Sequence, residues 1–207
     1  MDTELLAFAG ISVLLAVTPG PDMAVVTKNA LAHGRRGVVL TTAGLALAIS
    51  VWITATAFGL SALLRASGEA FFVLRLVGAA YLGYLGLRTL IDSRGPSADP
   101  VAGAPSSAPG RAIFRQGFLS AMSNPKLGVF FVTFLPQFVA PGQAVLPRLF
   151  LLGLIFAVIG LTWMNVYGLL VTRIRNVITA PRVRQWMERV TGVVLLGFGA
   201  RLALERL

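Results

Sequence analysis

Residues 4–32 read ELLAFAGISVLLAVTPGPDMAVVTKNALA and decide the fold, because this apolar run is long enough to cross a bilayer and is interrupted once. Crossing roughly 30 Å of hydrocarbon takes about 20 helical residues at ~1.5 Å each. The interruption is Thr18-Pro19-Gly20-Pro21-Asp22. Each proline removes a backbone donor and clashes with the preceding turn. The sequence therefore predicts a membrane helix that ends near Thr18 and restarts.

A second apolar run, residues 112–138, carries a matching interruption at Ser123-Asn124-Pro125-Lys126. Thr and Asn are good helix N-caps, and proline suits the first helical position that follows. We therefore expect Thr18 and Asn124 to cap the half-helices that restart. Irregular backbone cannot face lipid, so both breaks should line protein or water. The free N–H groups and positive helix end at each break would favour a bound carboxylate.

The composition agrees with a lipid-embedded protein. Of 207 residues, 56% are hydrophobic and 13% are charged, which leaves too little charge to cover a water-facing surface. The formal net charge of +10 lies in short gaps between apolar blocks, which is typical of loops in a multispanning protein and not of nucleic-acid binding. The chain has no cysteine and one histidine, which excludes disulfide frameworks and His- or Cys-clustered metal sites.

The apolar runs predict an all-α integral membrane protein with six transmembrane helices. The predicted spans are residues 4–32, 38–64, 70–91, 112–138, 146–172 and 185–204. Residues 92–110 hold four of the 11 prolines among Ser, Ala and Gly, which indicates a solvated linker. We therefore divide the chain into a first three-helix unit at 1–91, a cytoplasmic proline-rich linker at 92–111 and a second three-helix unit at 112–207.

The two units resemble each other. Pro19 aligns with Pro125, Gly44-Leu45 with Gly153-Leu154, and Arg75-x-x-Gly78 with Arg189-x-x-Gly192, in chain order and with slowly drifting offsets. A unit with an odd number of spans inserts its second copy upside down. The sequence therefore predicts two inverted three-helix repeats, with helices 1 and 4 broken at the proline motifs, as in many secondary transporters whose substrate site lies between the repeats.

The distribution of basic residues predicts the orientation. Most Lys and Arg residues lie in the first, third and fifth gaps, which the positive-inside rule places in the cytoplasm. Both termini are then extracytoplasmic. The acidic start Met1-Asp2-Thr3-Glu4 favours a retained first helix over a cleaved signal peptide.

Each break carries an ionisable residue, Asp22 in the first and Lys126 in the second. Such a residue costs about 2.5–3.5 kcal/mol at a helix centre, so it is kept where it is paired or functional. Two uses are open: an internal ion pair, or contacts to the two ends of a zwitterion. Asp22 is also the leading candidate for a proton carrier, although by its place along the helix it could instead lie near the cytoplasmic interface.

Polar residues in the other spans could line the pathway or bond a neighbouring helix. Asn165 in the fifth span is the one that we include in the substrate site. The predicted substrate-binding residues are thus Thr18, Pro19, Gly20, Pro21, Asp22, Asn124, Pro125, Lys126 and Asn165.

Several motifs together resemble a known family. They are Thr18-Pro19-Gly20-Pro21-Asp22, Gly78-Ala79-Ala80-Tyr81-Leu82-Gly83-Tyr84-Leu85-Gly86, Phe114-Arg115-Gln116-Gly117-Phe118 and Ser123-Asn124-Pro125-Lys126. The ordered set, over about residues 5–204, is similar to the LysE-type amino-acid exporters in their homoserine/threonine/leucine efflux branch. The resemblance implies a six-span bacterial inner-membrane protein that exports amino acids, driven by the proton gradient. Both proline motifs match the family's breaks by position, whereas the substrate does not carry over.

We therefore expect proton-coupled efflux of a neutral or hydrophobic amino acid, because Asp22 is the only acid well inside a span. An alternative is a cation or metal-ion exporter of related fold, although such a site would need several intramembrane ligands. Neither a nucleophile with its base nor a cofactor site is evident, so an enzyme is not expected. The expected partners are the amino acid, protons and the lipid bilayer. The oligomeric state stays open, and a homo-oligomer is compatible with the sequence.

Overall fold

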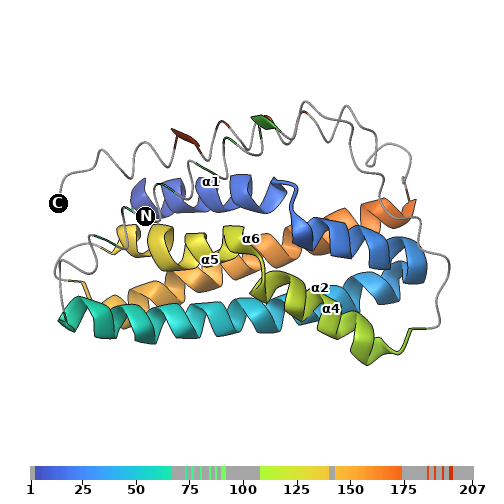
Figure 1. The fold of residues 1–207 in the computed structure, drawn as a ribbon, viewed down its shortest axis with the longest axis horizontal. Helices are drawn as coiled ribbons and strands as arrows, with labels where there is room; N and C mark the ends of the chain where they lie inside the picture. The colour runs from blue at the N-terminus through green and yellow to red at the C-terminus, as the bar shows by residue number, and fades with distance from the viewer. Residues whose placement is uncertain are drawn as a thin grey trace.

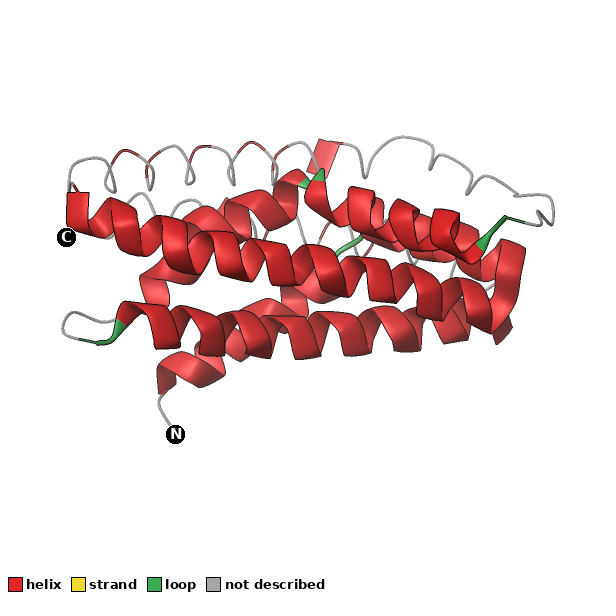
Figure 2. Ribbon diagram, turned by 90° about the horizontal axis from the view of Figure 1, so that it is seen from below, coloured by secondary structure: helices red, strands yellow, loops and turns green. Residues whose placement is uncertain are grey.

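The computed structural model describes residues 3–66, 108–139 and 143–173, together with isolated positions in the third and sixth predicted spans (73, 76, 80, 84, 87, 90, 91, 186, 189, 193, 196 and 197). The rest of those two spans and most of the predicted linker lie outside the described residues. The described segments are helical and contain no strand, which confirms the all-α prediction (Figures 1 and 2). The helices are α1 (Thr3–Val17), α2 (Pro21–Ala66), α4 (Gly110–Met122), α5 (Pro125–Val129), η1 (Phe130–Phe134), η2 (Leu135–Phe138) and α6 (Val145–Arg173).

The long helix α2 turns back on itself at Gly34. This residue has φ 56° and ψ −142°, a conformation that side chains with a Cβ rarely adopt. Residues 29 and 41 would be about 18 Å apart in a straight helix, yet the Asn29 amide nitrogen donates to the Thr41 hydroxyl over 2.9 Å. Helix α1 and the first part of α2 thus lead across the molecule, and the rest of α2 leads back (Figure 1).

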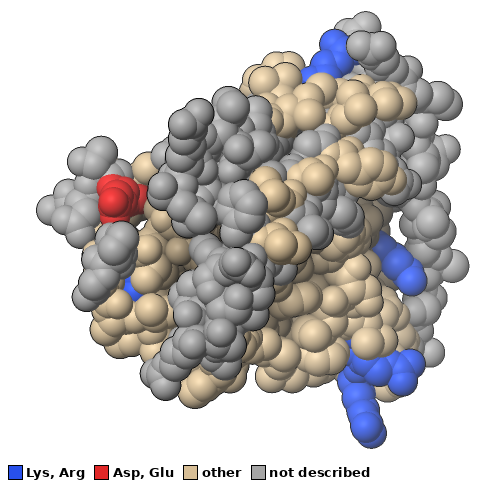
Figure 3. Space-filling model, turned by 60° about the vertical axis from the view of Figure 1, so that its left-hand side comes forward, with Lys and Arg blue, Asp and Glu red and all other residues tan. Residues whose placement is uncertain are grey.

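The described helices include membrane-spanning lengths. By length and composition, Val145–Arg173 and Pro21–Gly59 could each cross a bilayer, although Pro21–Gly59 contains the turn at Gly34. Gly110–Met122 and Pro125–Phe138 form a pair bent by 50° that together passes the same test. Large apolar side chains such as Leu6, Phe58 and Leu154 point outward. Figure 3 shows this as a wide uncharged surface with Lys and Arg side chains near its border. The described helices therefore have the length and the apolar surface of membrane-spanning helices. Six spans in two inverted repeats remain a prediction.

Glycines allow α2 and α4 to make a very close contact. A Cβ on Gly44 would overlap the carbonyl oxygen of Phe114, and a Cβ on Gly117 would overlap that of Thr41. The returning part of α2 and α4 therefore touch backbone to backbone, as small residues allow in membrane helices. This contact fixes α4, and with it the second break, against α2.

An aromatic cluster fills part of the core after the second break. Phe130 contacts Phe8, Phe131, Phe134 and Phe156 at ring-centroid distances of 4.3–6.0 Å. Phe130–Phe134 form a π-helix and Leu135–Phe138 a 3₁₀-helix, so the chain after the second break is not regularly α-helical. Such irregular turns often occur at functional sites.

Candidate functional site

The first break is built differently from its prediction. Helix α1 ends at Val17, and the Thr18 hydroxyl donates to the Leu14 carbonyl over 2.7 Å, so Thr18 closes α1. Helix α2 starts at Pro21, and the Gly20 carbonyl accepts from the Ala24 N–H over 3.1 Å. The residue at the N-cap position is therefore Gly20, and the prediction that Thr18 caps the restarted helix is wrong. A threonine hydroxyl can donate to the carbonyl oxygen four residues earlier in its own helix. Thr18 makes this bond to Leu14 and does not cap α2.

The second break follows its prediction. Asn124 is the N-cap of α5, its side-chain oxygen accepts from the Lys126 N–H over 3.0 Å, and Pro125 occupies the first helical position. The helix axis bends by 50° across this point. The proline needs no hydrogen-bond acceptor there, which makes the bend compatible with a regular restart.

The two breaks meet in space and bond to each other. The Asp22 carboxylate accepts from the Ser120 hydroxyl and from the Asn124 amide nitrogen, each over 2.6 Å. In the other direction, the Lys126 ammonium donates to the carbonyl oxygens of Leu15 and Thr18 over 3.0 and 3.1 Å. Each break thus supplies the polar partners of the other. Hydrogen bonds that involve a charged group are about twice as strong as neutral ones.

The two charges do not pair directly. Asp22 is 6% exposed and Lys126 is partly buried, yet no salt bridge joins their charged atoms, although both residues are among those described. The sequence left open whether Asp22 and Lys126 form an ion pair or contact the two ends of a zwitterion. This conformation does not contain the direct ion pair. Asp22 is held by neutral donors and Lys126 by neutral acceptors.

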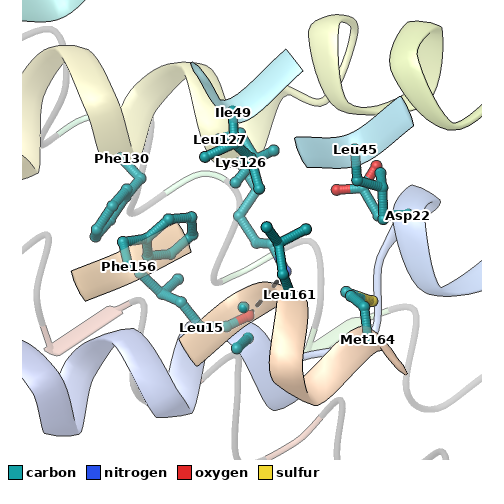
Figure 4. Close-up of a pocket in the computed structure, with 12 residues that line it drawn as sticks. Leu15, Asp22, Leu45, Ile49, Lys126, Leu127, Phe130, Phe156, Leu161 and Met164 are labelled. Atoms are coloured by element: carbon teal, nitrogen blue, oxygen red, sulfur yellow. Dashed lines mark hydrogen bonds between the residues drawn. The ribbon is translucent and has the colours of Figure 1, made fainter. Parts of the chain in front are cut away.

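Asp22 and Lys126 both line one cavity at the meeting point (Figure 4). Its volume is about 30 Å³, room for roughly two water molecules. The remaining lining residues carry no charge: Leu15, Ala16, Leu45, Ile49, Leu127, Phe130, Phe156, Gly160, Leu161 and Met164. The cavity therefore combines one carboxylate and one ammonium with apolar walls. An amino acid has more atoms than this space holds, so its binding would require the surrounding helices to separate.

The other predicted residues lie at different distances from this cavity. Pro19, Gly20 and Pro21 form the backbone of the first break, and a Cβ on Gly20 would lie 3.5 Å from the Lys126 ammonium nitrogen. Asn165 does not line the cavity. Its side-chain oxygen accepts from Thr42 and its amide nitrogen donates to the Leu161 carbonyl, so in this structure it joins α6 to α2.

Sequence reasoning missed Ser120 and the apolar lining. Ser120 lies four residues before Asn124, which is one helical turn away on the same face, so this spacing could have indicated it. Phe156, Gly160 and Met164 repeat at four-residue intervals on α6, but the same pattern fits ordinary core packing. Among the described residues there is no group of three or more His, Cys, Asp or Glu side chains that could hold a metal ion.

Comparison with known proteins identifies the family. The family model described as LysE type translocator matches residues 13–206, nearly the whole chain. The chain belongs to the LysE type translocator family. This confirms the resemblance seen in the motifs and makes the protein a membrane translocator.

Several relatives of this translocator match it from end to end. It is 31% identical to the homoserine/homoserine lactone efflux protein of Salmonella typhimurium, over 94% of this chain and 93% of that protein. It is 30% identical to the leucine efflux protein of Klebsiella pneumoniae, over 93% of this chain and 91% of that protein. It is 29% identical to the uncharacterized membrane protein YrhP of Bacillus subtilis, over 98% of this chain and 99% of that protein. No solved structure matches the translocator.

Proposed function

We propose that this translocator exports a neutral amino acid across the bacterial inner membrane in exchange for protons. The observation that carries the proposal is the cavity between the two breaks, where one carboxylate and one ammonium face a space with apolar walls. Relatives named for leucine efflux and for homoserine efflux support an amino-acid substrate, and both of these amino acids have uncharged side chains.

In the proposed binding mode, the two ends of the amino acid replace the present hydrogen-bond partners of Asp22 and Lys126. The substrate ammonium would take the place of the Ser120 and Asn124 donors at Asp22. The substrate carboxylate would take the place of the Leu15 and Thr18 carbonyls at Lys126. Asp22 and Lys126 would then each keep a partner. The displaced Ser120 and Asn124 donors and the Leu15 and Thr18 carbonyls would bond to water in the opened cavity, because leaving such groups unpartnered is the main cost of opening the network.

Asp22 is also the proposed proton carrier. Among the residues that line the cavity it is the one carboxylic acid. A protonated Asp22 no longer attracts the substrate ammonium, so a proton that binds Asp22 from outside would release the amino acid to that side. The proton would then be carried inward on Asp22 when the cavity opens to the cytoplasm. Alternating exposure of the cavity to the two sides completes an exchange of this kind.

The architecture that we propose remains six helices in two inverted repeats, residues 1–91 and 112–207, joined by a cytoplasmic linker at 92–111 and with both termini extracytoplasmic. The described part supports it in one respect. Helix α1 and helices α4–α5 run in opposite directions, and each path has a break next to the same cavity (Figure 1).

Export by proteoliposomes tests the proposal. Protein is reconstituted with labelled leucine or homoserine inside, and release is measured with and without an imposed proton gradient. Asp22→Asn should abolish the stimulation by the gradient. The matched control is Glu4→Gln, because Glu4 is 58% exposed and forms a salt bridge with Arg148, and neither residue lines the cavity. Gradient-dependent export that survives Asp22→Asn would exclude Asp22 as the proton carrier, and a wild-type protein that releases neither amino acid would contradict the proposed substrate class.

A further inference from the structure

Three inward-facing glycines on α6 have different surroundings. A Cβ on Gly153 would lie 2.7–3.1 Å from Ile53, and a Cβ on Gly168 would lie 2.7–2.9 Å from Val26 and Val38. Both glycines therefore allow α2 to approach α6 closely. Gly160, which is buried between them, has no atom of the described residues within 4 Å of its Cβ position. Packing among the described helices therefore does not explain Gly160.

Gly160 instead faces the cavity. It is one of the lining residues, and a buried position with no neighbour within van der Waals distance is what an empty space beside it produces. Glycine weakens a helix relative to alanine. An alanine would fit here without contact in the described conformation, so the glycine keeps space free at the cost of helix stability.

The free space has walls on both sides. Phe156 lies four residues before Gly160 and Met164 four residues after it, so the three share one face of α6. Both side chains are buried and line the cavity together with Leu45 of α2 (Figure 4). The missing side chain at 160 thus forms an apolar notch between an aromatic ring and a thioether.

We propose that Gly160 determines the specificity of the amino-acid site, by leaving a notch that receives the apolar side chain of the substrate. The inference rests on the proposed function and names a part of its substrate class: neutral amino acids with a bulky aliphatic side chain. The ammonium and carboxylate of the substrate engage Asp22 and Lys126, and the aliphatic side chain lies over Gly160 between Phe156 and Met164. A methyl group added at 160 occupies the space that the largest substrates need.

The test compares two amino acids of different size in one preparation. Proteoliposomes are loaded with labelled leucine and labelled alanine, and the ratio of their release rates is measured. Gly160→Ala should lower the leucine-to-alanine ratio about 10-fold, as expected for one methyl group in an apolar pocket, and Gly160→Val should lower it further. The control is Gly59→Ala, since Gly59 is also in a helix with nothing within 4 Å but is exposed on the outer surface. It should leave the ratio unchanged.

Thermal unfolding in detergent supplies the second measurement. Gly160→Ala should unfold at the wild-type temperature or above, whereas Gly168→Ala should unfold at a lower temperature because its methyl meets Val26 and Val38. The inference would be overturned by a folded Gly160→Ala protein in which the release rates of leucine and alanine fall by the same factor, or in which neither rate changes. So would a lowered unfolding temperature, because it would show that no free space exists at 160. Failure of the proposed function is recognised separately, as a wild-type protein that releases neither amino acid.

Discussion

The contact between the two breaks can be measured by removing the side chain of Asn124. In Asn124→Ala the protein loses the 2.6 Å hydrogen bond to the Asp22 carboxylate and the cap on the Lys126 N–H. A hydrogen bond to a charged group contributes about 1.5–3 kcal/mol, and an N-cap contributes about 1 kcal/mol. We therefore expect the free energy of unfolding to fall by about 2.5–4 kcal/mol.

The assay is denaturant unfolding of the purified protein in detergent, with a double-mutant cycle that adds Asp22→Ala. The coupling energy between positions 22 and 124 should be about 1.5–3 kcal/mol, since the cycle isolates the bond between the two breaks. Asn165→Ala is the matched control. Asn165 joins α6 to Thr42 through a neutral hydrogen bond of 3.1 Å, so its removal should cost only about 0.5–1.5 kcal/mol. A coupling energy within about 0.5 kcal/mol of zero would refute the reasoning.

Two further variants test the turn in α2 and the ammonium in the cavity. Gly34→Ala should lower the free energy of unfolding by about 1–3 kcal/mol, because φ 56° and ψ −142° are strained for a residue with a Cβ; an unchanged denaturation midpoint would contradict this backbone conformation. Lys126→Met should raise the amino-acid concentration for half-maximal export about 10-fold or more, because a hydrogen bond to a charged group is lost. An unchanged half-maximal concentration would contradict contact between Lys126 and the substrate.

Much of the helix pattern follows from residue types along the chain. The apolar runs at 4–32 and 112–138 and the prolines at 19, 21 and 125 predict long helices with one interruption each, because hydrocarbon thickness and the missing proline N–H act locally. The described residues contain both interruptions where they were predicted. The Asn124 cap was predicted correctly for the same reason, since its partner is only two residues away.

Where the outcome depended on a choice between two local bonds, sequence reasoning failed. Thr18 is followed by proline just as Asn124 is, but its hydroxyl bonds back to Leu14 and α2 restarts three residues later at Pro21. Asn165 shows the same limit at longer range. A polar residue in a membrane helix can line a cavity or bond a neighbouring helix, and only the position of Thr42 determines which of the two occurs.

The sequence by itself determined that this chain forms lipid-embedded helices, that two of them are broken, and that one acid and one base lie at the breaks. These properties depend on length, hydropathy and the chemistry of single residues. Only the tertiary structure decided that Asp22 bonds to Ser120 and Asn124 and that Lys126 bonds to the carbonyls of Leu15 and Thr18. It also decided that Gly160 faces the cavity while Gly153 and Gly168 are packed against α2. The physical reason is that these contacts join residues far apart in the chain, and their geometry depends on how closely the helices approach at glycines such as Gly44 and Gly117.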